Sequence, residues 1–533
     1  MARSRASWLV IPLLVALCSI LGGVFGPELD EVNAATTEDD IKSGLRIFSK
    51  VYEVVENNFA DKVSADRVIY QGAIPGMLRT LDPHSNFFDP KLYNQMRDDQ
   101  RGRYFGVGMQ IGQRNGRIIV MAPFPGSPAY RAGIRPGDII AEVNDKKTDS
   151  MSTADVADLL KGPRGTQAQI QIQREGLDKP LTMNITRDEI PRKSVKDSFW
   201  VKPGIMYLDV ESFNENTSTE VNENFKRLGE KNVKGLILDL RNNPGGLLNE
   251  GVAVAGRFLQ KGQLVVSHRG RANPERTYVE RRGSGAADYP IVVIVNKYSA
   301  SAAEIVSGAL QDHDRAWVIG EDTFGKGLVQ TVYPLSENTG LALTTAKYYT
   351  PSGRLIQRDY SNISFFDYYY RKDMEVKNQK DVKMTDSGRA VYGGNGIAPD
   401  EKFVLPKLNP FQIELLLRRA SFFAFVPAYF NGKEAKLPQG WSPDAAVIDQ
   451  FKAFLKKQNA TFTEEDFKAN LPWVKTTMQA EFYKTAFDID EAGRYEIETD
   501  PEVQKAIEAL PKARELGDKA KKMIVQRMAE PKK

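Results

Sequence analysis

The chain has 533 residues, of which 41% are hydrophobic and 27% are charged, as in a globular protein of about three or four domains. Its 73 basic and 69 acidic residues nearly balance, so the net charge of +4 gives no argument for binding to nucleic acid or to an anionic membrane surface. The only cysteine is Cys18, near the N-terminus. The rest of the chain therefore has neither a disulfide nor a cysteine nucleophile.

The first 34 residues differ in kind from the rest of the chain. Arg3 and Arg5 precede the apolar stretch Trp8–Phe25, and Val32-Asn33-Ala34 resembles a small-residue cleavage site. This pattern predicts a secretory signal peptide or an uncleaved N-terminal anchor, and the proline and glycines in the stretch favour cleavage. We therefore expect the protein in an extracytoplasmic space, the periplasm if the source is Gram-negative, with attachment to the inner membrane if the segment is retained.

Residues 35–101 are expected to form a helical region, because apolar residues recur there at steps of three or four. The stripe consists of Ile41, Leu45, Phe48, Val51 and Val55. Asp82–Ser85 is predicted to be a turn, and we interpret His84 within it as a turn histidine that bonds locally rather than as a catalytic group.

The most informative stretch is Pro290–Gln330. Its apolar run Ile291–Val295 predicts a buried strand, and a helix is expected to begin near Ser301 because apolar residues follow at helical spacing. A second strand, Ala316–Ile319, gives way to a glycine-bracketed loop that carries Lys326. Both residues are thus expected beyond the carboxyl ends of strands, where open α/β sheets place their sites.

Two interpretations of this serine and lysine compete. In the first, Ser301 only caps a helix, with Glu304 completing a capping box, and Lys326 is a solvated loop cation. In the second, small residues around Ser301 leave room for a substrate backbone, and the apolar neighbours of Lys326 remove water from its ammonium. A desolvated lysine has a lowered pKa and can act as a base.

A second strand–turn–helix unit lies upstream. Gly204–Val210 and Gly235–Leu240 predict strands, the second ends in D-L-R-N-N-P-G-G, and Leu247–Leu259 predicts a helix. The pair Gly245-Gly246 presents bare backbone N–H groups, as an oxyanion site requires, although a simple tight turn would use the same residues.

Downstream of Gln330, further strands are expected at Leu341–Tyr349 and at Tyr349–Gln357. Asp359–Gly394 is polar and tyrosine-rich and is predicted to be an inserted loop. The tail, Pro410–Lys533, is predicted to be mostly helical, with boundaries near Pro427 and Pro472 and a solvated end.

Residues 102–188 resemble a PDZ domain, through Y-F-G-V-G-M-Q-I, then A-G-I-R-P-G-D, and a predicted helix at Thr153–Leu160. Such a module suits peptide ends, because a glycine-containing loop can present N–H groups to a carboxylate and an edge strand can pair with an extended peptide. The residues expected to bind peptide are Phe105, Gly106, Val107, Gly108, Met109 and Ile111.

The pattern S-A-S-A-A-E-I, followed 25 residues after its second serine by the lysine of F-G-K-G-L-V-Q, resembles the C-terminal processing (tail-specific) serine peptidases. The resemblance runs from about Ile47 to Leu405. It implies that Ser301 is the nucleophile, that Lys326 is the general base, and that Gln330 orients the lysine. It also implies an oxyanion site made by Gly245 or Gly246 together with the backbone N–H of Ala302; the sequence does not decide which glycine.

The resemblance further implies a crotonase/ClpP-like α/β protease core with an inserted PDZ domain. The expected order is a signal or anchor (1–34), an N-terminal helical region (35–101), the PDZ domain (102–188), the protease core (189–405) and a helical C-terminal domain (406–533). The implied enzyme is an endopeptidase that recognises the C-termini of unfolded or tail-exposed proteins, without a cofactor. The C-terminal domain is expected to bind an adaptor or to form a homodimer.

Other chemistries fit the sequence less well. His313 lies 12 residues beyond Ser301 on the same predicted helix. At 1.5 Å per residue that is about 18 Å, too far for a Ser-His-Asp triad. No residues have metal-ligand spacing. Two alternatives remain: a non-catalytic PDZ adaptor that retains a protease fold, and a crotonase-like acyl-CoA enzyme, against which the export signal and the PDZ module argue.

Overall fold

The computed structural model describes residues 38–283, 288–361, 363–370, 381–431 and 433–529. The chain divides into two units, residues 1–76 and 77–533, and each is described by itself. The predicted signal or anchor lies outside the described residues. Among the described residues, no helix combines the length and apolarity needed to cross a membrane.

The first unit is helical, as expected. It contains α2 (Glu38–Asn58), α3 (Ala65–Val68), a π-helical turn (Ile69–Ala73) and the start of α4 (Ile74–Arg79). The predicted apolar stripe lies on α2, where all its members are more than a third exposed.

The PDZ-like part of the second unit is built on one sheet, in the order β3-β4-β5-β7-β8, with β6 paired to β5. Alternate apolar residues of its strands pack against α7, whose bounds Thr153–Leu160 are those expected from the sequence. A separate ribbon, β2 with β9, leads into and out of this sheet. The strands are β2 (Arg103–Gly106), β3 (Met109–Arg114), β4 (Arg117–Pro123), β5 (Ile139–Val143), β6 (Lys146–Lys147), β7 (Gln167–Gln173), β8 (Leu181–Thr186) and β9 (Asp188–Pro191), and α6 is Pro128–Arg131.

The central sheet of the second unit has the order β10-β11-β12-β15-β16-β21. Its strands run parallel except β10, which is antiparallel to β11. The predicted strand Ile291–Val295 is confirmed as β15, and all five of its residues are buried, as in a strand covered on both faces. The other strands are β10 (Val195–Lys202), β11 (Ile205–Val210), β12 (Gly235–Asp239), β16 (Trp317–Gly320) and β21 (Glu401–Lys402).

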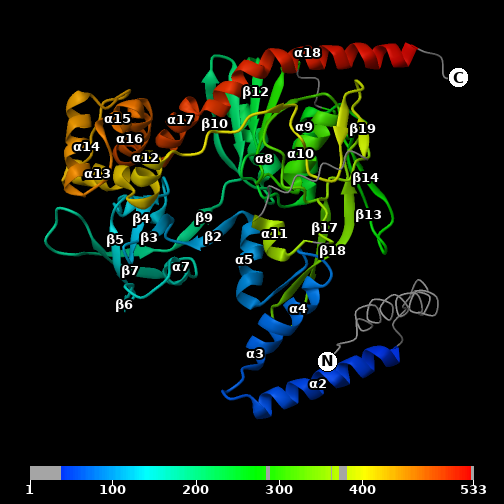
Figure 1. Cartoon of the computed structure of the whole chain (residues 1–533), viewed down its shortest axis with the longest axis horizontal. Helices are drawn as coiled ribbons and strands as arrows, with labels where there is room; N and C mark the ends of the chain where they lie inside the picture. Colours follow the sequence, from blue (N-terminus) through cyan, green and yellow to red (C-terminus); the bar gives the residue numbers. More distant parts are fainter. Residues whose placement is uncertain (1–37, 284–287, 362, 371–380, 432, 530–533) are drawn as a thin grey trace, which may run out of the picture. The chain divides into compact units, whose positions relative to one another are not determined.

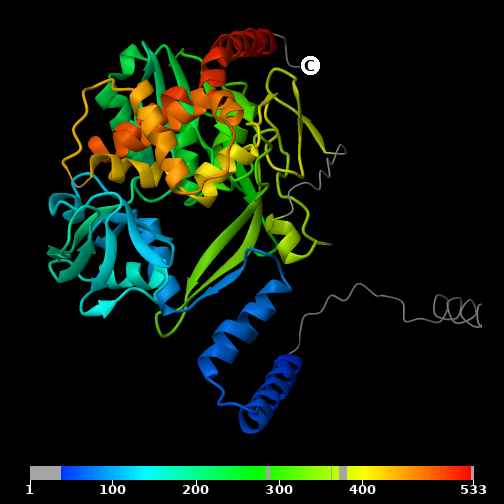
Figure 2. The same ribbon diagram turned by 60° about the vertical axis from the view of Figure 1, so that its left-hand side comes forward.

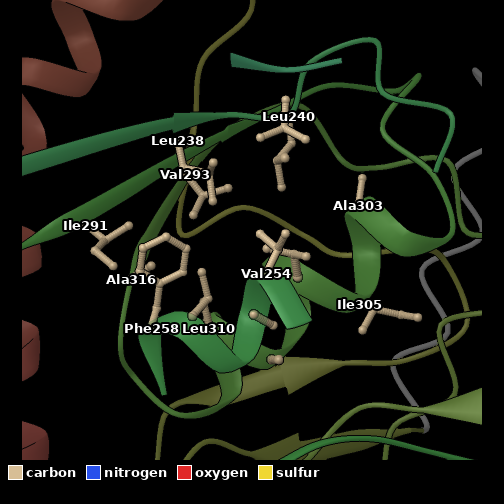
Figure 3. Close-up of a cluster of buried hydrophobic side chains, with 14 of the residues drawn as sticks. Leu238, Leu240, Val254, Phe258, Ile291, Val293, Ala303, Ile305, Leu310 and Ala316 are labelled. Atoms are coloured by element: carbon tan, nitrogen blue, oxygen red, sulfur yellow. The ribbon is translucent and has the colours of Figure 1, made fainter. Parts of the chain in front are cut away.

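One face of this sheet is covered by three helices that follow its strands: α8 (Thr217–Leu228), α9 (Leu248–Phe258) and α10 (Ala302–Asp312). Figure 3 shows the resulting cluster, with Leu238 and Val293 of the strands beside Phe258 and Leu310 of the helices. The expected α/β class is confirmed, since alternate residues of each strand point to opposite covered faces.

The opposite face of the sheet is covered by α18 (Pro501–Ala529), drawn in red in Figure 1. Val503, Ala506, Ala509 and Ala513 of this helix are buried against Ile237, Val292 and Ile319. The prediction that the end of the chain is solvated is therefore wrong for this helix. Its apolar stripe is made mostly of alanines, which give a weak hydrophobic signal beside the many lysines and glutamates of the outer face.

A second, antiparallel sheet has the order β1-β18-β13-β14, with β17 also paired to β18. The strand expected at Tyr349–Gln357 is absent from this described stretch: a turn at Pro351 leaves one isolated bridge between Tyr349 and Leu355. Proline and glycine in Tyr-Thr-Pro-Ser-Gly account for the turn. The strands are β1 (Asn86–Phe88), β13 (Leu264–Arg269), β14 (Arg276–Val279), β17 (Leu328–Pro334) and β18 (Gly340–Tyr349), and α5 (Pro90–Arg101) follows β1.

The segment predicted to be an inserted loop, Asp359–Gly394, instead carries the short helix α11 (Phe365–Tyr370) and a hairpin of β19 (Val382–Met384) and β20 (Ala390–Tyr392). The predicted boundary at Pro427 is wrong, because this proline lies inside α13, whereas Pro472 stands in the first turn of α16, as expected. The remaining helices are α12 (Pro410–Ile413), α13 (Ser421–Phe430), α14 (Ala445–Lys457), α15 (Glu464–Ala469), α16 (Leu471–Ala486) and α17 (Ile489–Thr499), with π-helical residues Glu414–Arg418 and a 3-10 turn Glu230–Asn232.

Candidate active site

Ser301 stands at the junction between the turn after β15 and helix α10, as expected. Its backbone has φ 56° and ψ −112°, a region that a serine adopts only under strain. Such strain costs roughly 1–3 kcal/mol and persists only where the surroundings hold it. The conformation leaves Ser301 half-buried, while the helix behind it is buried throughout.

The turn before α9 is fastened to the Ser301 turn by Asn243. Its carbonyl accepts from the Ala300 N–H at 2.9 Å, and its side chain accepts from the Gly245 N–H at 2.8 Å. A Cβ added to Gly245 would lie 2.7 Å from the Ser301 Cβ and 2.9 Å from the Ala302 nitrogen, so only glycine fits beside the nucleophile.

The two glycines of the predicted oxyanion pair differ in their N–H groups. That of Gly245 is bound to Asn243, whereas that of Gly246 has no acceptor among the described residues, and Gly246 is exposed. The Ala302 N–H, in the first turn of α10, has no acceptor within the helix. The N–H groups of Gly246 and Ala302 are therefore the better-placed pair of donors.

Lys326 lies on the loop between β16 and β17, and Gln330 lies on β17. The Lys326 ammonium donates to the Gln330 side-chain oxygen at 3.0 Å, and the Gln330 amide donates to the backbone carbonyl of His84. The structure thus brings Lys326 and Gln330 together as the sequence suggested. No hydrogen bond joins Lys326 to the Ser301 hydroxyl in the part of the chain that the structure describes.

Glu304 joins the Ser301 turn to the Lys326 loop. One oxygen of its carboxylate accepts from the backbone N–H of Ser301 at 2.8 Å and from that of Lys326 at 2.9 Å. The other accepts from the Thr323 hydroxyl at 2.5 Å and from the Gly325 N–H at 2.7 Å. The capping interaction between Glu304 and Ser301 is therefore present, but the same carboxylate also fixes the loop that carries the base.

Tyr348 makes a second bridge. Its hydroxyl lies 3.0 Å from the Ser301 carbonyl and also within hydrogen-bonding distance of the Lys326 carbonyl. Tyr348 is 1% exposed and Glu304 is fully buried. The sequence predicts Glu304 only as a helix cap and does not indicate Tyr348, because a tyrosine in a predicted strand carries no signal for either contact.

The surroundings of Lys326 set its charge. Burial lowers the pKa of its ammonium, and Glu304 and Asp82 oppose that shift only in part. Burial also raises the pKa of Glu304, against its four hydrogen bonds. The pKa of His84 is lowered to about 3 by burial first and by the nearby Lys326 ammonium second. Hence Lys326 becomes neutral at a lower pH than an ordinary lysine, and His84 is neutral at any working pH.

The interpretation of His84 as a locally bonded turn residue is incomplete. Its backbone N–H does bond locally, to Asp82 at 2.7 Å, but its carbonyl holds Gln330 and its ring contacts tyrosines from α11. The other histidines lie away from the site: His313 binds Asp386 and the Leu264 carbonyl, and His268 pairs with Tyr278. The described residues contain no group of His, Cys, Asp and Glu that could hold a metal ion.

The predicted peptide-binding residues are split between two strands and the link that joins them. Phe105 and Gly106 pair with β9, Met109 and Ile111 belong to β3, and Val107 and Gly108 connect them. β3 is the end strand of its sheet and packs beside α7.

A serine beside backbone N–H groups that lack acceptors in the described part of the chain, with a largely buried lysine on a separate, neighbouring loop, is an arrangement typical of acyl-transfer enzymes. Comparison with known proteins narrows this class. The family model described as peptidase family S41 matches residues 204–362, and that described as PDZ domain matches residues 119–174.

Named relatives agree with these matches. A carboxy-terminal-processing protease of Bartonella bacilliformis is 40% identical over 324 residues, which are 60% of this chain and 74% of that protein. Carboxy-terminal processing protease CtpB of Bacillus subtilis is 32% identical over 327 residues, 61% of this chain and 68% of that protein. Among solved structures, a photosystem II D1 C-terminal processing protease is 29% identical, with a TM-score of 0.35 over 69% of this chain and 90% of that one.

The chain therefore belongs to peptidase family S41 and is a serine-type carboxy-terminal processing protease with a PDZ domain. This decides against an acyl-CoA enzyme, and the names of the relatives favour catalysis over a non-catalytic adaptor.

The bridge made by Glu304 leads to a prediction. Glu304→Gln keeps the size of the side chain but sets an NH2 group against N–H donors, so we expect the chain to fold while kcat falls roughly 10²-fold through misplacement of Ser301 and Lys326. Kinetics on an unfolded protein substrate and circular dichroism would measure the two effects. Glu321→Gln, in the loop after β16, is the matched control, and equal kcat values for the two variants would contradict the role given to Glu304.

Proposed function

We propose that this protein is an exported endopeptidase that recognises substrate C-termini through its PDZ domain and cleaves unfolded or tail-exposed proteins by a Ser-Lys acyl-enzyme mechanism. The observation that carries the proposal is the single Glu304 oxygen bound to the N–H groups of both Ser301 and Lys326, because it makes neighbours of a nucleophile and a base that lie on separate loops.

The chemistry follows from the groups present. The Ser301 oxygen attacks the scissile carbonyl carbon while neutral Lys326 takes the hydroxyl proton, and the N–H groups of Gly246 and Ala302 receive the oxyanion. The tetrahedral species collapses, the C–N bond breaks, and Lys326 returns the proton to the leaving amine. Lys326 then deprotonates a water, which attacks the acyl-enzyme; the ester C–O bond breaks and Lys326 returns the proton to the Ser301 oxygen. Gln330 keeps the lysine side chain oriented throughout.

The next prediction concerns the dyad of Ser301 and Lys326. Ser301→Ala and Lys326→Ala should each abolish proteolysis without unfolding the chain, and the double variant should be no worse than either, because the two residues act as a unit. Gln330→Ala should be milder. Turnover of an unfolded protein substrate measures all four, and near-normal turnover by Lys326→Ala would show that another group is the base.

The pH dependence tests the same assignment. Because the pKa of Lys326 is lowered, the neutral base forms as pH rises through that lowered value, and kcat/KM should rise with it. Asp209 is the necessary control, since burial and the Asp239 carboxylate raise its pKa to about 8. Asp209→Asn should retain the rising limb. If kcat/KM is constant from pH 5 upwards, or if its rise with pH disappears in Asp209→Asn, Lys326 is not the titrating base.

Backbone geometry supports peptide binding at the PDZ domain. The Val107 carbonyl accepts from the Ala129 N–H, and the Gly108 carbonyl accepts from the Phe124 N–H and the Ser127 hydroxyl. In a trans peptide the C=O and the next N–H point in opposite directions. The N–H groups of Gly108 and Met109 therefore point away from residues 124–129, where a carboxylate can receive both.

The role of peptide docking leads to a further prediction. We propose that a bound C-terminus favours the arrangement in which Lys326 and the oxyanion turn are aligned with Ser301, which requires tighter binding to that arrangement than to the resting one. A short peptide with an apolar C-terminal residue and a free carboxylate should then accelerate cleavage of an internally quenched substrate that lacks a free C-terminus.

The alternative is that the PDZ domain only tethers substrate and raises its local concentration. In that case the same peptide would compete or do nothing. The amidated peptide is the control, because it lacks the charge that the N–H groups receive. If the peptide slows cleavage of the quenched substrate or leaves its rate unchanged at concentrations where the peptide is bound, the gating proposal is wrong and the PDZ domain only tethers substrate.

Export and attachment are proposed from residues 1–34 alone, which lie outside the described residues. N-terminal sequencing of the protein recovered from the extracytoplasmic fraction should begin near Ala35. An intact Met1 on a membrane-bound form would show an anchor instead. A homodimer or an adaptor contact through the helical C-terminal domain is part of the same proposal; its helices α12–α16 share an apolar core of their own.

A further inference from the structure

Helix α11 lies beyond residue 362, where the match to the peptidase family model ends. In Figures 1 and 2 it is seen beside the ends of β17 and β18, the strands next to the Lys326 loop. Two of its residues, Tyr368 and Tyr369, pack against His84, with ring centroids 5.4 and 5.9 Å from that of the imidazole. Tyr368 is 2% exposed, so this contact belongs to the interior of the protein.

The hydroxyl groups of the two tyrosines bracket the His84 ring. Tyr368 lies 2.8 Å from one ring nitrogen, and Tyr369 lies 3.2 Å from the other while donating to the Pro83 carbonyl at 2.8 Å. A neutral imidazole with one donor and one acceptor nitrogen satisfies both contacts. Since the His84 carbonyl holds the Gln330 amide, α11 fixes the turn that fixes the partner of Lys326.

A second path leads from Tyr368 to the other side of the base. The Gln357 amide donates to the Tyr368 hydroxyl at 3.1 Å, and its oxygen accepts from the Gly327 N–H at 2.8 Å. Gly327 follows Lys326 directly. The Tyr368 hydroxyl therefore lies on two hydrogen-bonded paths to the neighbourhood of Lys326, one through His84 and Gln330 and one through Gln357 and Gly327.

The same residues enclose the space beside the lysine. Phe324 lies edge-on to Tyr368 with centroids 5.7 Å apart and packs against Tyr369 at 6.1 Å. The Arg358 guanidinium stacks over Tyr368 at 4.4 Å and over Phe324 at 4.6 Å. These rings and this stack keep water out of one side of the Lys326 loop.

We propose that the α11 tyrosines are positioning residues for the catalytic base, with Tyr368 acting through His84–Gln330 and through Gln357–Gly327 to hold Lys326 aligned and out of water. The inference rests on the proposed role of Lys326 as the base. It gives the inserted segment a part in the reaction that neither its sequence nor the family match suggests.

The proposal predicts a change in the pH dependence of kcat/KM. The ionisable groups around Lys326 are Glu304 from α10, Asp82 and His84 from the turn before β1, and Tyr348 from β18, while Arg358, after β18, acts on His84. Tyr368→Phe leaves each of these residues in place and removes one hydrogen-bond partner of the His84 ring. If the hydroxyl keeps the loop closed, its loss admits water, favours the charged ammonium, and moves the rising limb of the profile to higher pH.

The test compares kcat/KM against pH for the full-length wild type and Tyr368→Phe. At neutral pH we expect kcat to fall about five- to tenfold, as for the loss of one buried hydrogen bond, with KM for a C-terminal peptide substrate unchanged and the limb displaced upwards. Tyr369→Phe should displace the rising limb less, because the Tyr369 hydroxyl supports the His84 path, whereas the Tyr368 hydroxyl lies on both the His84 and the Gln357 paths. Tyr429→Phe, in the separate apolar cluster of the C-terminal helices, should leave the profile unchanged.

Combination with His84→Ala shows whether the paths are shared. The double variant should lose less than the product of the two single losses, because both remove the same support for Gln330. If the rising part of the kcat/KM profile has the wild-type pH midpoint in both Tyr368→Phe and Tyr369→Phe, the inference is overturned, even if the thermal stability of these variants falls. Activity in Lys326→Ala would instead overturn the base assignment, and the inference with it.

Discussion

The structure of the site depends on one buried carboxylate. Glu304 has no contact with solvent, and a charge in such a place is tolerated only when its oxygens are fully paired. Its four donors come from the nucleophile turn and from the loop of the base, so satisfying the carboxylate and assembling the site are the same event. The Tyr348 hydroxyl likewise joins the two segments, through the backbone carbonyl groups of Ser301 and Lys326. Together they hold Ser301 in a strained backbone conformation that a free chain would leave.

The sheet supplies the frame for this assembly, and the C-terminal helix completes the sheet. Arg241, at the end of β12 and just before the oxyanion turn, pairs with Asp239 of its own strand and with Asp500 and Glu502 at the start of α18. The helix that covers the far face is thereby tied to the turn that carries Gly245 and Gly246. Arg241 is largely buried beside three carboxylates, and removing the arginine would leave them without their shared cation.

The sequence was enough to predict the elements and site residues that depend on local residue patterns or on a recognisable motif. β15, α7, and the positions of Ser301, Lys326 and Gln330 follow from apolar runs, glycines and the peptidase resemblance. The contacts that align the site were out of reach because they join residues far apart in sequence, such as Gln330 with His84 and Glu304 with Gly325. The burial of α18 was not predicted because alanines pack well in an interior but contribute little to a hydrophobic pattern. The helix α11 was not predicted because its tyrosine-rich polar stretch has no apolar stripe at helical spacing. The assignment of the nucleophile and base stays a prediction, since among the described residues no hydrogen bond joins the Lys326 ammonium to the Ser301 hydroxyl.

The chain offers a covalent route from the peptide site to both halves of the catalytic machinery. α5 connects the His84 turn, which holds Gln330, to β2 and the Val107–Gly108 link of the PDZ domain. Near its end, the Gln100 carbonyl accepts from the Glu215 N–H, two residues after Phe213, and Phe213 exchanges hydrogen bonds with Gly245 and Leu247 around Gly246. A helix is stiff along its axis, so a displacement at the PDZ loop cannot be absorbed within α5. Under the proposed gating, α5 is the element that links the PDZ loop to Gln330 and to the oxyanion turn, while α11 holds His84 from the other side.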